Sequence, residues 1–365
     1  MKILHVISNL CTGGAERLVT DLLPRFKQDG IEADVLLFDG TDTPFKKKLQ
    51  DAGVTVFELS KGGSVYNPLN IFSLISYLKK YDIVHTHGTA PQLFAAIGSV
   101  LCSVVLVTTE HTTSNRRRGW KWYAPIDRWM YTRYKKIICI SDKTELCLKK
   151  HLCKNLPTIC TINNGIDTSV FFNAQPDVKF CTMYKDYKRM IMVSRFAPAK
   201  DQKTVIRAIK ILPEDYHAFF VGDGPIRHDC EELTKELKVS DRVHFLGVRS
   251  DVPQLLKSCD IAILSSHWDG FGLAAVEGMA AHKPVIASNV DGLREVVSKA
   301  GLLFEHENTK ELAEKILSLS EDTEFYKQTA DNCFNRAKEY DISFMVKGYE
   351  LVYKELMSKN IISNE

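Results

Sequence analysis

The sequence lacks the features that mark several common classes of protein. None of its ten cysteines forms a CxxC pair, and no Cys/His group has zinc-finger spacing. No apolar run approaches the length of a membrane span, and the first residues, MKILHVISNL, are typical of a strand rather than a signal peptide. A formal charge of +3 is too small to indicate a nucleic-acid partner. We therefore expect a cytoplasmic protein whose cysteines are reduced, small and mostly buried.

Familiar phosphate and metal motifs are missing as well. The stretches GGAER (13–17) and GDGPIR (222–227) both follow expected strands, but neither completes a GxGxxG fingerprint or a Walker loop. A nicotinamide cofactor is therefore not expected, and taken alone GDGPIR is best interpreted as a tight turn between strand and helix. No acidic pair such as DxD is placed to hold a divalent cation, so no metal is expected either.

Short apolar runs alternate with helical patterns along most of the chain. Most of the runs are hydrophobic on both faces, as buried parallel strands are. Alternation with short connections predicts an α/β protein with doubly wound parallel sheets. The expected strands are 2–7, 33–38, 54–59, 82–87, 104–109, 136–141 and 158–163, then 190–194, 217–222, 242–247, 260–266, 284–288 and 301–305.

The alternating pattern weakens between the two series of strands. We predict an N-terminal Rossmann-like domain over 1–170, a linker over 171–188 and a second Rossmann-like domain over 189–340. Residues 341–365 are expected to form a C-terminal helix that crosses back to the N-terminal domain. Two similar α/β domains that face each other indicate a ligand in the cleft between them, beyond the carboxyl ends of the strands.

Two cations follow the first expected strand of the second domain. Arg195 and Lys200 lie five residues apart on a loop that contains a proline. They could converge on one anion, with arginine as a bidentate fork and lysine as a point charge. Two solvated surface charges are the commoner outcome for an isolated pair. The position of the loop, at the carboxyl end of a strand, favours the anion site.

Two acids frame a glycine-rich segment, DGFGLAAVE, between Asp269 and Glu277. A helix from about residue 270 would present its amide groups and dipole to a phosphate. Eight residues differ from two full helical turns by about 80°, so Glu277 would point to roughly the same side as Asp269. A carboxylate there suits the two hydroxyl groups of a ribose. The alternative is that Asp269 only caps the helix and Glu277 is a surface charge, but the apolar helix between them looks buried.

Taken together, the motifs resemble those of a known family. DGFGLAAVE and the Arg195/Lys200 loop occur with GGAER, TTEHT (108–112), NNGID (163–167), GDGP (222–225) and HFLG (244–247), in the order found in the retaining nucleotide-sugar glycosyltransferases of family 4. The resemblance covers almost the whole chain and implies the GT-B fold, with two Rossmann-like domains facing across a cleft. The first acid departs from the pattern, because the family usually has glutamate where this chain has Asp269.

The resemblance implies a role for each matching residue. Arg195 and Lys200 would bind the donor diphosphate as leaving group, Asp269 and His111 would lie beside the donor sugar, and Glu277 would hold the ribose. These four catalytic candidates are thus His111, Arg195, Lys200 and Asp269. The implied donor-binding residues are Gly14, Arg195, Lys200, Val248, Arg249, Gly270, Phe271, Gly272, Leu273 and Glu277.

We accordingly expect a retaining, metal-independent transferase with no cofactor. It would move a hexose or N-acetylhexosamine from a nucleotide diphosphate sugar, UDP by preference, to a lipid-linked or growing glycan of a surface polysaccharide. No side chain clearly serves as nucleophile, so attack on the same face as the leaving phosphate is the expected route. Two alternatives remain open: another GT-B enzyme, such as a nucleotide-sugar epimerase or a phosphorylase, and a non-catalytic subunit that only binds nucleotide sugar.

A basic and aromatic stretch spans 115–136. It holds eight lysines and arginines, one acid and three of the four tryptophans. Such mixtures occur in elements that lie on anionic membranes, here the inner face of the cytoplasmic membrane. A helix with a solvated basic face and aromatic core contacts explains the composition equally well, and both interpretations stay open.

Overall fold

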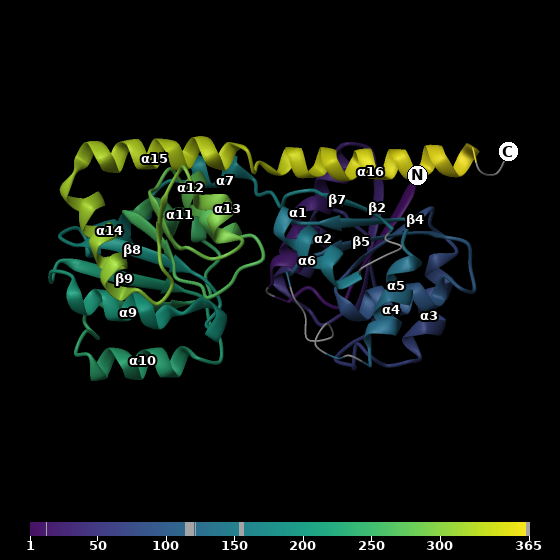
Figure 1. Ribbon diagram of the computed structural model, residues 1–365, viewed down its shortest axis with the longest axis horizontal. Helices are drawn as coiled ribbons and strands as arrows, with labels where there is room; N and C mark the ends of the chain where they lie inside the picture. Colours follow the sequence, from purple (N-terminus) through teal and green to yellow (C-terminus); the bar gives the residue numbers. More distant parts are fainter. Residues whose placement is uncertain (12, 114–119, 121, 153–156, 363–365) are drawn as a thin grey trace. The chain divides into compact units, whose positions relative to one another are not determined.

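The computed structural model describes residues 1–365 except 12, 114–119, 121, 153–156 and 363–365. The chain divides into two compact units. The first unit combines Met1–Gly165 with Ile342–Glu365, and the second is Ile166–Asp341. Each unit is built around one parallel sheet with helices on both faces (Figure 1).

Strands and helices alternate through both units. In the first unit the elements are β1 (Lys2–Ile7), α1 (Gly14–Gln28), β2 (Glu32–Asp39), α2 (Pro44–Asp51), β3 (Val56–Ser60), α3 (Asn70–Leu78), β4 (Ile83–His87), α4 (Thr89–Gly98), β5 (Val105–Glu110), α5 (Ala124–Thr132), β6 (Lys136–Cys139), α6 (Asp142–Leu152), β7 (Thr158–Thr161) and α16 (Ile342–Ile362). In the second they are α7 (Thr168–Phe172), α8 (Val178–Met183), β8 (Lys188–Val193), the 3₁₀ turn η2 (Pro198–Lys200), α9 (Gln202–Ile211), β9 (Tyr216–Val221), α10 (Arg227–Glu236), β10 (Val243–Gly247), α11 (Val252–Ser258), β11 (Ile261–Leu264), α12 (Leu273–Ala280), β12 (Val285–Ser288), α13 (Leu293–Val297), β13 (Leu302–Phe304), α14 (Thr309–Glu321) and α15 (Thr323–Lys338).

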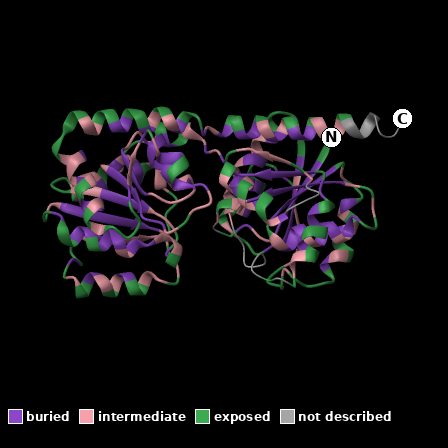
Figure 2. Ribbon diagram, viewed as in Figure 1, coloured by how far each residue is buried: buried purple, intermediate pink, exposed green. Residues whose placement is uncertain are grey.

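The sheet of the first unit has the order β3-β2-β1-β4-β5-β6-β7, all parallel. One hydrophobic cluster lies between the sheet and helices α1 and α16, and another lies under α3, α4 and α5. The inner strands are buried, the edge strands β3 and β7 are half-buried, and the outer faces of the helices are exposed (Figure 2). The order reverses between β1 and β4, which is the topological switch point where ligands bind in such sheets.

The sheet of the second unit repeats this arrangement in the order β10-β9-β8-β11-β12-β13. Its strand pairs are again all parallel, and the switch point lies between β8 and β11. The two doubly wound sheets confirm the predicted GT-B fold class, with two Rossmann-like domains. All thirteen expected strands are present, each with bounds within two residues of the prediction at the start and the end.

The chain passes between the units twice, at neighbouring points. Ile166 forms a parallel bridge with Asp341, and the Thr168 hydroxyl donates a 2.5 Å hydrogen bond to the Asp341 carboxylate. The segment 171–188, which we expected to be a linker, instead belongs to the second unit and carries α8. Asp177 caps α8, since its carboxylate accepts hydrogen bonds from the amides of Lys179 and Phe180.

Helix α16 packs on the first unit, where Tyr349 and Tyr353 are fully buried. Among the described residues, no helix is both long and apolar enough to cross a membrane. The nine cysteines that the structure describes are all free, and Cys11 is the one exposed among them.

Candidate active site

The loop after β8 carries Arg195 and Lys200 at the switch point of the second sheet. Phe196 anchors this loop, since its side chain is 1% exposed beneath it. Asp201 ends the loop in a left-handed conformation, with φ of 48°, and caps α9 by accepting hydrogen bonds from the amide and hydroxyl of Thr204. Arg195 is exposed, and no ion-pair partner of it occurs in the part of the chain that the structure describes. The buried Phe196 and the cap at Asp201 therefore fix the backbone of the loop that carries Arg195 and Lys200.

The GDGP turn (222–225) packs against the backbone of this loop. Gly222 has φ of +131°, and a Cβ added there would lie 2.1 Å from the carbonyl oxygen of Ser194. A Cβ at Gly224, with φ of +157°, would lie 2.2 Å from the carbonyl oxygen of Phe196. Only glycine allows such close approach of two backbones. The motif thus serves as the tight turn that we expected from its sequence, packed against the loop of the cations.

The loop after β11 is tied to the cation loop by backbone contacts. The buried Ser265 hydroxyl lies 2.7 Å from the carbonyl oxygen of Asp201 and 3.2 Å from that of Lys200. The His267 amide donates a 2.9 Å hydrogen bond to the carbonyl oxygen of Ala199. These contacts bring Arg195, Lys200 and the Asp269 segment into one site.

Asp269 makes three contacts within that site. One carboxylate oxygen pairs with the Lys200 ammonium group, and the other accepts hydrogen bonds from the amides of Phe271 (3.3 Å) and Gly272 (3.1 Å). Asp269 therefore caps the glycine turn that precedes α12 rather than the helix itself, whose N-cap residue is Gly272, and it is also an ion-pair partner. Two of the amides predicted to meet the donor phosphate are bonded to Asp269 in this structure.

The helix after this turn begins later than predicted. We expected it from about residue 270, but α12 starts at Leu273, because Gly272 adopts φ of +90° and interrupts helical geometry. Gly292 lies against the same turn, where a Cβ would come within 2.4 Å of the carbonyl oxygen of Asp269. Neither Ser265 nor Gly292 carries a local motif that announces these roles, since both depend on contacts between loops distant in sequence.

Glu277 lies on α12 and is 2% exposed. The neighbouring Ala275, Val276 and Met279 are fully buried, so the helix is covered along most of its length. A buried carboxylate needs polar partners or a ligand, since an isolated charge is costly to remove from water. The alternative of Glu277 as a surface charge is thereby excluded.

The two residues predicted to meet the nucleotide base follow β10. Val248 is 72% exposed, and Arg249 is held by a paired contact with the carboxylate of Asp251, at 2.8 and 2.5 Å. The hydrogen bond to this carboxylate raises the pKa of Arg249. A local ion pair therefore holds the Arg249 side chain at the sheet edge next to β9.

The remaining two site candidates belong to the first unit. Gly14 opens α1, and a Cβ there would meet no described atom within 4 Å. His111 follows β5, and its Nε2 lies 3.0 Å from Nδ1 of His87. Burial lowers the pKa of His111 to about 4, so its imidazole is neutral near pH 7. His87 was not among the predicted site residues.

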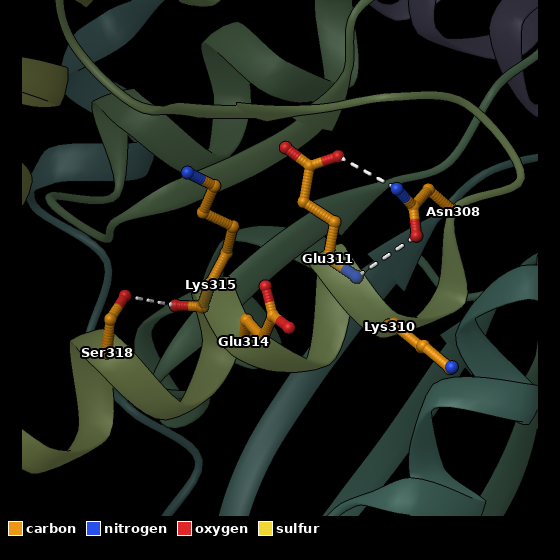
Figure 3. A pocket seen from close by; sticks show the side chains of 6 residues that line it. All are labelled: Asn308, Lys310, Glu311, Glu314, Lys315 and Ser318. Atoms are coloured by element: carbon orange, nitrogen blue, oxygen red, sulfur yellow. Dashed lines mark hydrogen bonds between the residues drawn. The ribbon is translucent and has the colours of Figure 1, made fainter.

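A surface hollow of about 660 Å³ lies elsewhere, over α14 (Figure 3). Its lining includes Asn308 and Glu311, which cap the helix through two mutual hydrogen bonds of 3.2 Å. None of the predicted donor-site residues lines it. We interpret it as the solvated charged face of a helix.

Two Rossmann-like units, with cations, a glycine turn and a buried acid at the switch point of the second, define a glycosyltransferase of the GT-B class. The family model "Glycosyltransferase Family 4" matches residues 12–170, and the model "Glycosyl transferases group 1" matches residues 177–338. The chain belongs to these GT-B glycosyltransferases, of family 4-like type.

Individual relatives agree with that assignment. The chain is 36% identical to a lipopolysaccharide core biosynthesis glycosyltransferase, LpsD, of Rhizobium meliloti, covering 80% of this chain and 79% of the relative. It is 28% identical to the UDP-Gal:alpha-D-GlcNAc-diphosphoundecaprenol alpha-1,3-galactosyltransferase of Escherichia coli, over 78% of this chain and 76% of that one. A crystal structure of Anabaena Alr3699/HepE with UDP-glucose shares the fold, with a TM-score of 0.86 at 23% identity, covering 97% of this chain and all of that one.

Proposed function

We propose that this glycosyltransferase uses a nucleotide diphosphate sugar, UDP-hexose or UDP-N-acetylhexosamine, and retains the configuration of the sugar. The acceptor would be a lipid-linked or growing glycan of a surface polysaccharide. The proposal depends mainly on the hydrogen bonds and the ion pair that connect the loops after β8 and β11. They place Arg195, Lys200 and the turn at residues 269–272 together at the switch point. The relatives named for UDP-galactose, a diphosphoundecaprenol acceptor and lipopolysaccharide core support the choice of donor and acceptor.

The proposed reaction needs little from the protein beyond charge stabilisation. The bond between the sugar carbon and the diphosphate oxygen breaks, and the acceptor oxygen forms a bond to that carbon on the same face. The acceptor proton passes to the leaving phosphate. Negative charge grows on the diphosphate as the bond breaks, and Arg195 and Lys200 would stabilise it as fixed cations. Because these cations can neutralise the diphosphate, we propose that the reaction needs no metal.

Thermal unfolding with a panel of nucleotide sugars tests the donor assignment. A ligand present at 100 times its dissociation constant should stabilise the fold by about 2.7 kcal/mol. For a unit of this size that corresponds to a rise in melting temperature of roughly 5–10 °C. Transfer to a lipid-linked acceptor should follow for the stabilising sugar and persist with EDTA. Conversion of the donor without acceptor would indicate an epimerase instead, and binding without any turnover would indicate a non-catalytic subunit.

Replacing Asp269 with glutamate should change catalysis more than nucleotide binding. The longer side chain cannot cap the turn and meet Lys200 from the same position, so the carboxylate shifts toward the donor sugar by about 1.5 Å. We expect about a tenfold change in kcat/KM, or in preference between sugars, with the Kd for UDP within about twofold. Asp229→Glu, at a solvent-exposed ion pair on α10, is the matched control. An effect on the Kd for UDP alone would contradict the role given to Asp269.

Contact with an anionic membrane is a further part of the proposal. Within the basic and aromatic stretch, residues 115–119 and 121 lie outside the described residues. On the described part, Trp120, Trp122, Ile126 and Trp129 are 48%, 69%, 41% and 40% exposed, whereas Met130 and Tyr131 of α5 are buried. The exposed tryptophans next to Arg128 provide the amphipathic chemistry of a membrane-surface element.

Cosedimentation with anionic vesicles measures this contact. We expect binding at low salt that weakens as salt is raised, because the basic residues act through a screened field. The double variant Trp122→Ala/Trp129→Ala should weaken binding about tenfold. Phe344→Ala, which removes an exposed aromatic side chain from α16, should not. Absence of binding to anionic vesicles at low salt would remove the membrane from the proposal.

A further inference from the structure

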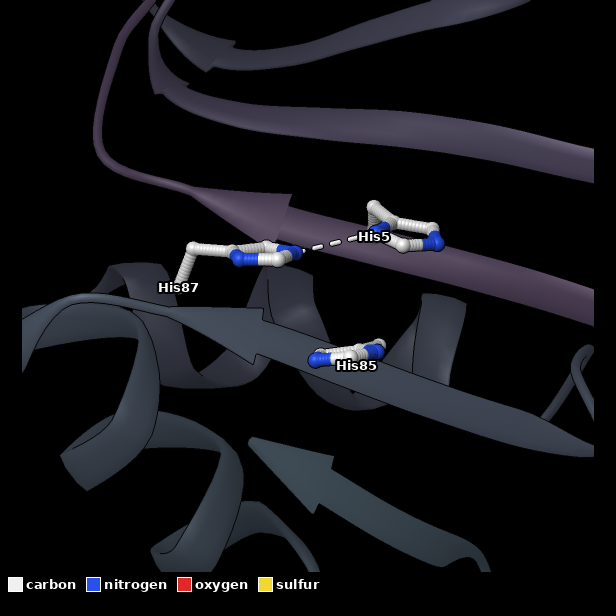
Figure 4. Close-up of side chains that lie close together, drawn as sticks. All are labelled: His5, His85 and His87. Carbon is white, nitrogen blue, oxygen red and sulfur yellow. Dashed lines mark hydrogen bonds between the residues drawn. The ribbon is translucent and has the colours of Figure 1, made fainter. Parts of the chain in front are cut away.

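Three histidines lie together on one face of the first sheet, outside the residues predicted for the site. His5 of β1 pairs in register with His85 of β4, and His87 follows on the same face of β4 two residues later. Their exposed fractions are 0%, 0% and 1%. Figure 4 shows the three rings close together, with the hydrogen bond between His5 and His87 drawn.

A continuous chain of hydrogen bonds runs through this cluster to His111. Nδ1 of His5 lies 2.9 Å from Nε2 of His87, and Nδ1 of His87 lies 3.0 Å from Nε2 of His111. At the other end, the hydroxyl of Tyr353 on α16 lies 2.6 Å from Nδ1 of His85 and 3.4 Å from Nε2 of His5. Nδ1 of His111 is buried and has no hydrogen-bond partner among the described residues. The chain therefore ends on one unused nitrogen.

All four imidazoles are neutral. Burial lowers the pKa of His5 to about 3 and that of His111 to about 4, and it lowers the pKa values of His85 and His87 far below the ordinary value. A neutral imidazole carries one proton, so one ring nitrogen donates and the other accepts. Every contact in the chain consequently has a direction, and fixing one contact fixes those that follow.

The contact between Tyr353 and His85 sets that direction. At 2.6 Å it is within the range of O–H donors and shorter than N–H donors usually give, so the phenol donates to His85. The phenol has no second proton, and His5 must therefore point its Nε2–H at the phenol oxygen. His5 Nδ1 then accepts from His87.

The same reasoning continues to the end of the chain. Because His87 donates from Nε2 to His5, its Nδ1 is unprotonated and accepts from Nε2–H of His111. His111 then has its single proton on Nε2, and its Nδ1 presents a lone pair. The far side of His85 is consistent with this order, since its Nε2 lies 2.8 Å from the Thr109 hydroxyl and can donate to it.

We propose that Tyr353, His5 and His87 are positioning residues that hold His111 in the Nε2-protonated tautomer, so that Nδ1 accepts a hydrogen bond from a hydroxyl group of the bound sugar. This inference rests on the proposed function and on the family resemblance, which implies a donor sugar beside His111. It adds that His111 neither donates a proton nor carries a charge there. The side chain selects a hydroxyl group and orients it.

Three clustered histidines can also bind a metal ion, and here one nitrogen from each ring lies within 4.8 Å of the others. The geometry favours the hydrogen-bond chain. In a zinc site the nitrogens would converge on one centre at about 2.0–2.1 Å. Here the His5 and His87 rings are within 12° of parallel, and their facing nitrogens are already hydrogen-bonded to each other. His85 uses both of its nitrogens on Tyr353 and Thr109.

Nitrogen-15 NMR of the full chain, labelled at histidine, tests the tautomer without any substrate. We expect His111, identified by loss of its signals in His111→Gln, to show a protonated Nε2 and an unprotonated Nδ1 at pH 7. A protonated Nδ1, an average of the two tautomers or a charged ring would overturn the proposal. Equimolar Zn²⁺ should leave the spectrum unchanged, and specific shifts of the signals of His5, His85 and His87 would overturn it as well.

Variants at His87 test what the chain does for the ligand. His87→Leu removes the acceptor for His111, whereas the side-chain oxygen of His87→Asn can still accept from Nε2–H. We expect His87→Leu to raise the KM for the nucleotide sugar about tenfold, with the Kd for free UDP within twofold, and His87→Asn to restore most of the loss. His217→Leu, which removes a buried histidine from its contact with the half-buried His244 in the second unit, is the control and should leave KM unchanged.

The possible failures are distinguishable. Wild-type KM in His87→Leu, or equal loss in His87→Asn, would overturn the positioning role. If the wild-type protein binds no nucleotide sugar, the proposed function fails while the NMR spectrum still decides the tautomer.

Discussion

Replacing Lys200 with alanine is expected to lower kcat by about 10²- to 10³-fold, the size of effect seen when one preorganised charge-stabilising donor is removed from an active site. Lys200 ends the η2 turn, and its carbonyl oxygen is tied to Ser265. Its ammonium group pairs with Asp269, so it is held at the site before donor binds. Since the charge on the diphosphate grows only as the sugar bond breaks, turnover should fall more than the affinity for UDP.

The ion pair between Lys200 and Asp269 must be considered when kcat of Lys200→Ala is interpreted. Removing Lys200 leaves the carboxylate of Asp269 without its cation, so part of the loss could come from Asp269. A thermodynamic cycle with Asp269→Asn and the double variant Lys200→Ala/Asp269→Asn separates the loss of the cation from the effect of the unpaired carboxylate. Lys203→Ala, at an exposed ion pair with Asp229 on the following helix, is the control. Unchanged turnover in Lys200→Ala would remove this residue from the leaving-group site.

The strands could be predicted from the sequence because buried parallel strands are hydrophobic on both faces. The run 104–109 fits such a strand, and the structure places β5 over Val105–Glu110. Helices α7 and α8 were not predicted because they are only five and six residues long, too short to show a helical period. The aspartate caps Asp167 and Asp177 were the available signal.

The residues of the site that directly follow a strand could be predicted from the sequence. Arg195 and Lys200 follow β8, and Asp269 follows β11, so the adjacency of the two strands brings them together. The start of α12 was not predictable in the same way. Gly272 has φ of +90°, and a Cβ there would come within 2.6 Å of the side chain of Leu293, the first residue of α13. Sequence spacing alone could not distinguish a helix start at 270 from a glycine turn followed by a helix at 273.

The hydrogen-bonded histidine cluster could not be predicted from the sequence, because it too depends on contacts between distant segments. His5 and His85 are far apart in sequence, and they meet because the strand order crosses from β1 to β4 at the switch point. The tyrosine that orders the chain comes from the last helix, which returns to the first unit. An isolated histidine in a strand carries no sign of these partners.

Replacing Glu277 with alanine should weaken donor binding through the ribose. Hydrogen bonds to a charged group contribute about 1.5–3 kcal/mol, so we expect the Kd for UDP to rise about 10- to 100-fold. The KM for the nucleotide sugar should rise with it, and kcat should change less, because the ribose is bound equally in the ground and transition states. Calorimetric titration with UDP and steady-state kinetics measure the two effects.

The ligand provides the sharpest control for Glu277. A UDP analogue that lacks both ribose hydroxyls should bind the wild type weakly and should lose almost nothing further in Glu277→Ala, because the partner groups are already gone. Glu277→Gln keeps the shape of the buried side chain on α12 and should recover part of the affinity. Melting temperatures of the unliganded variants separate loss of binding from loss of fold. An equal loss of affinity for UDP and for its dihydroxyl-free analogue would mean that Glu277 acts on the helix and not on the ribose.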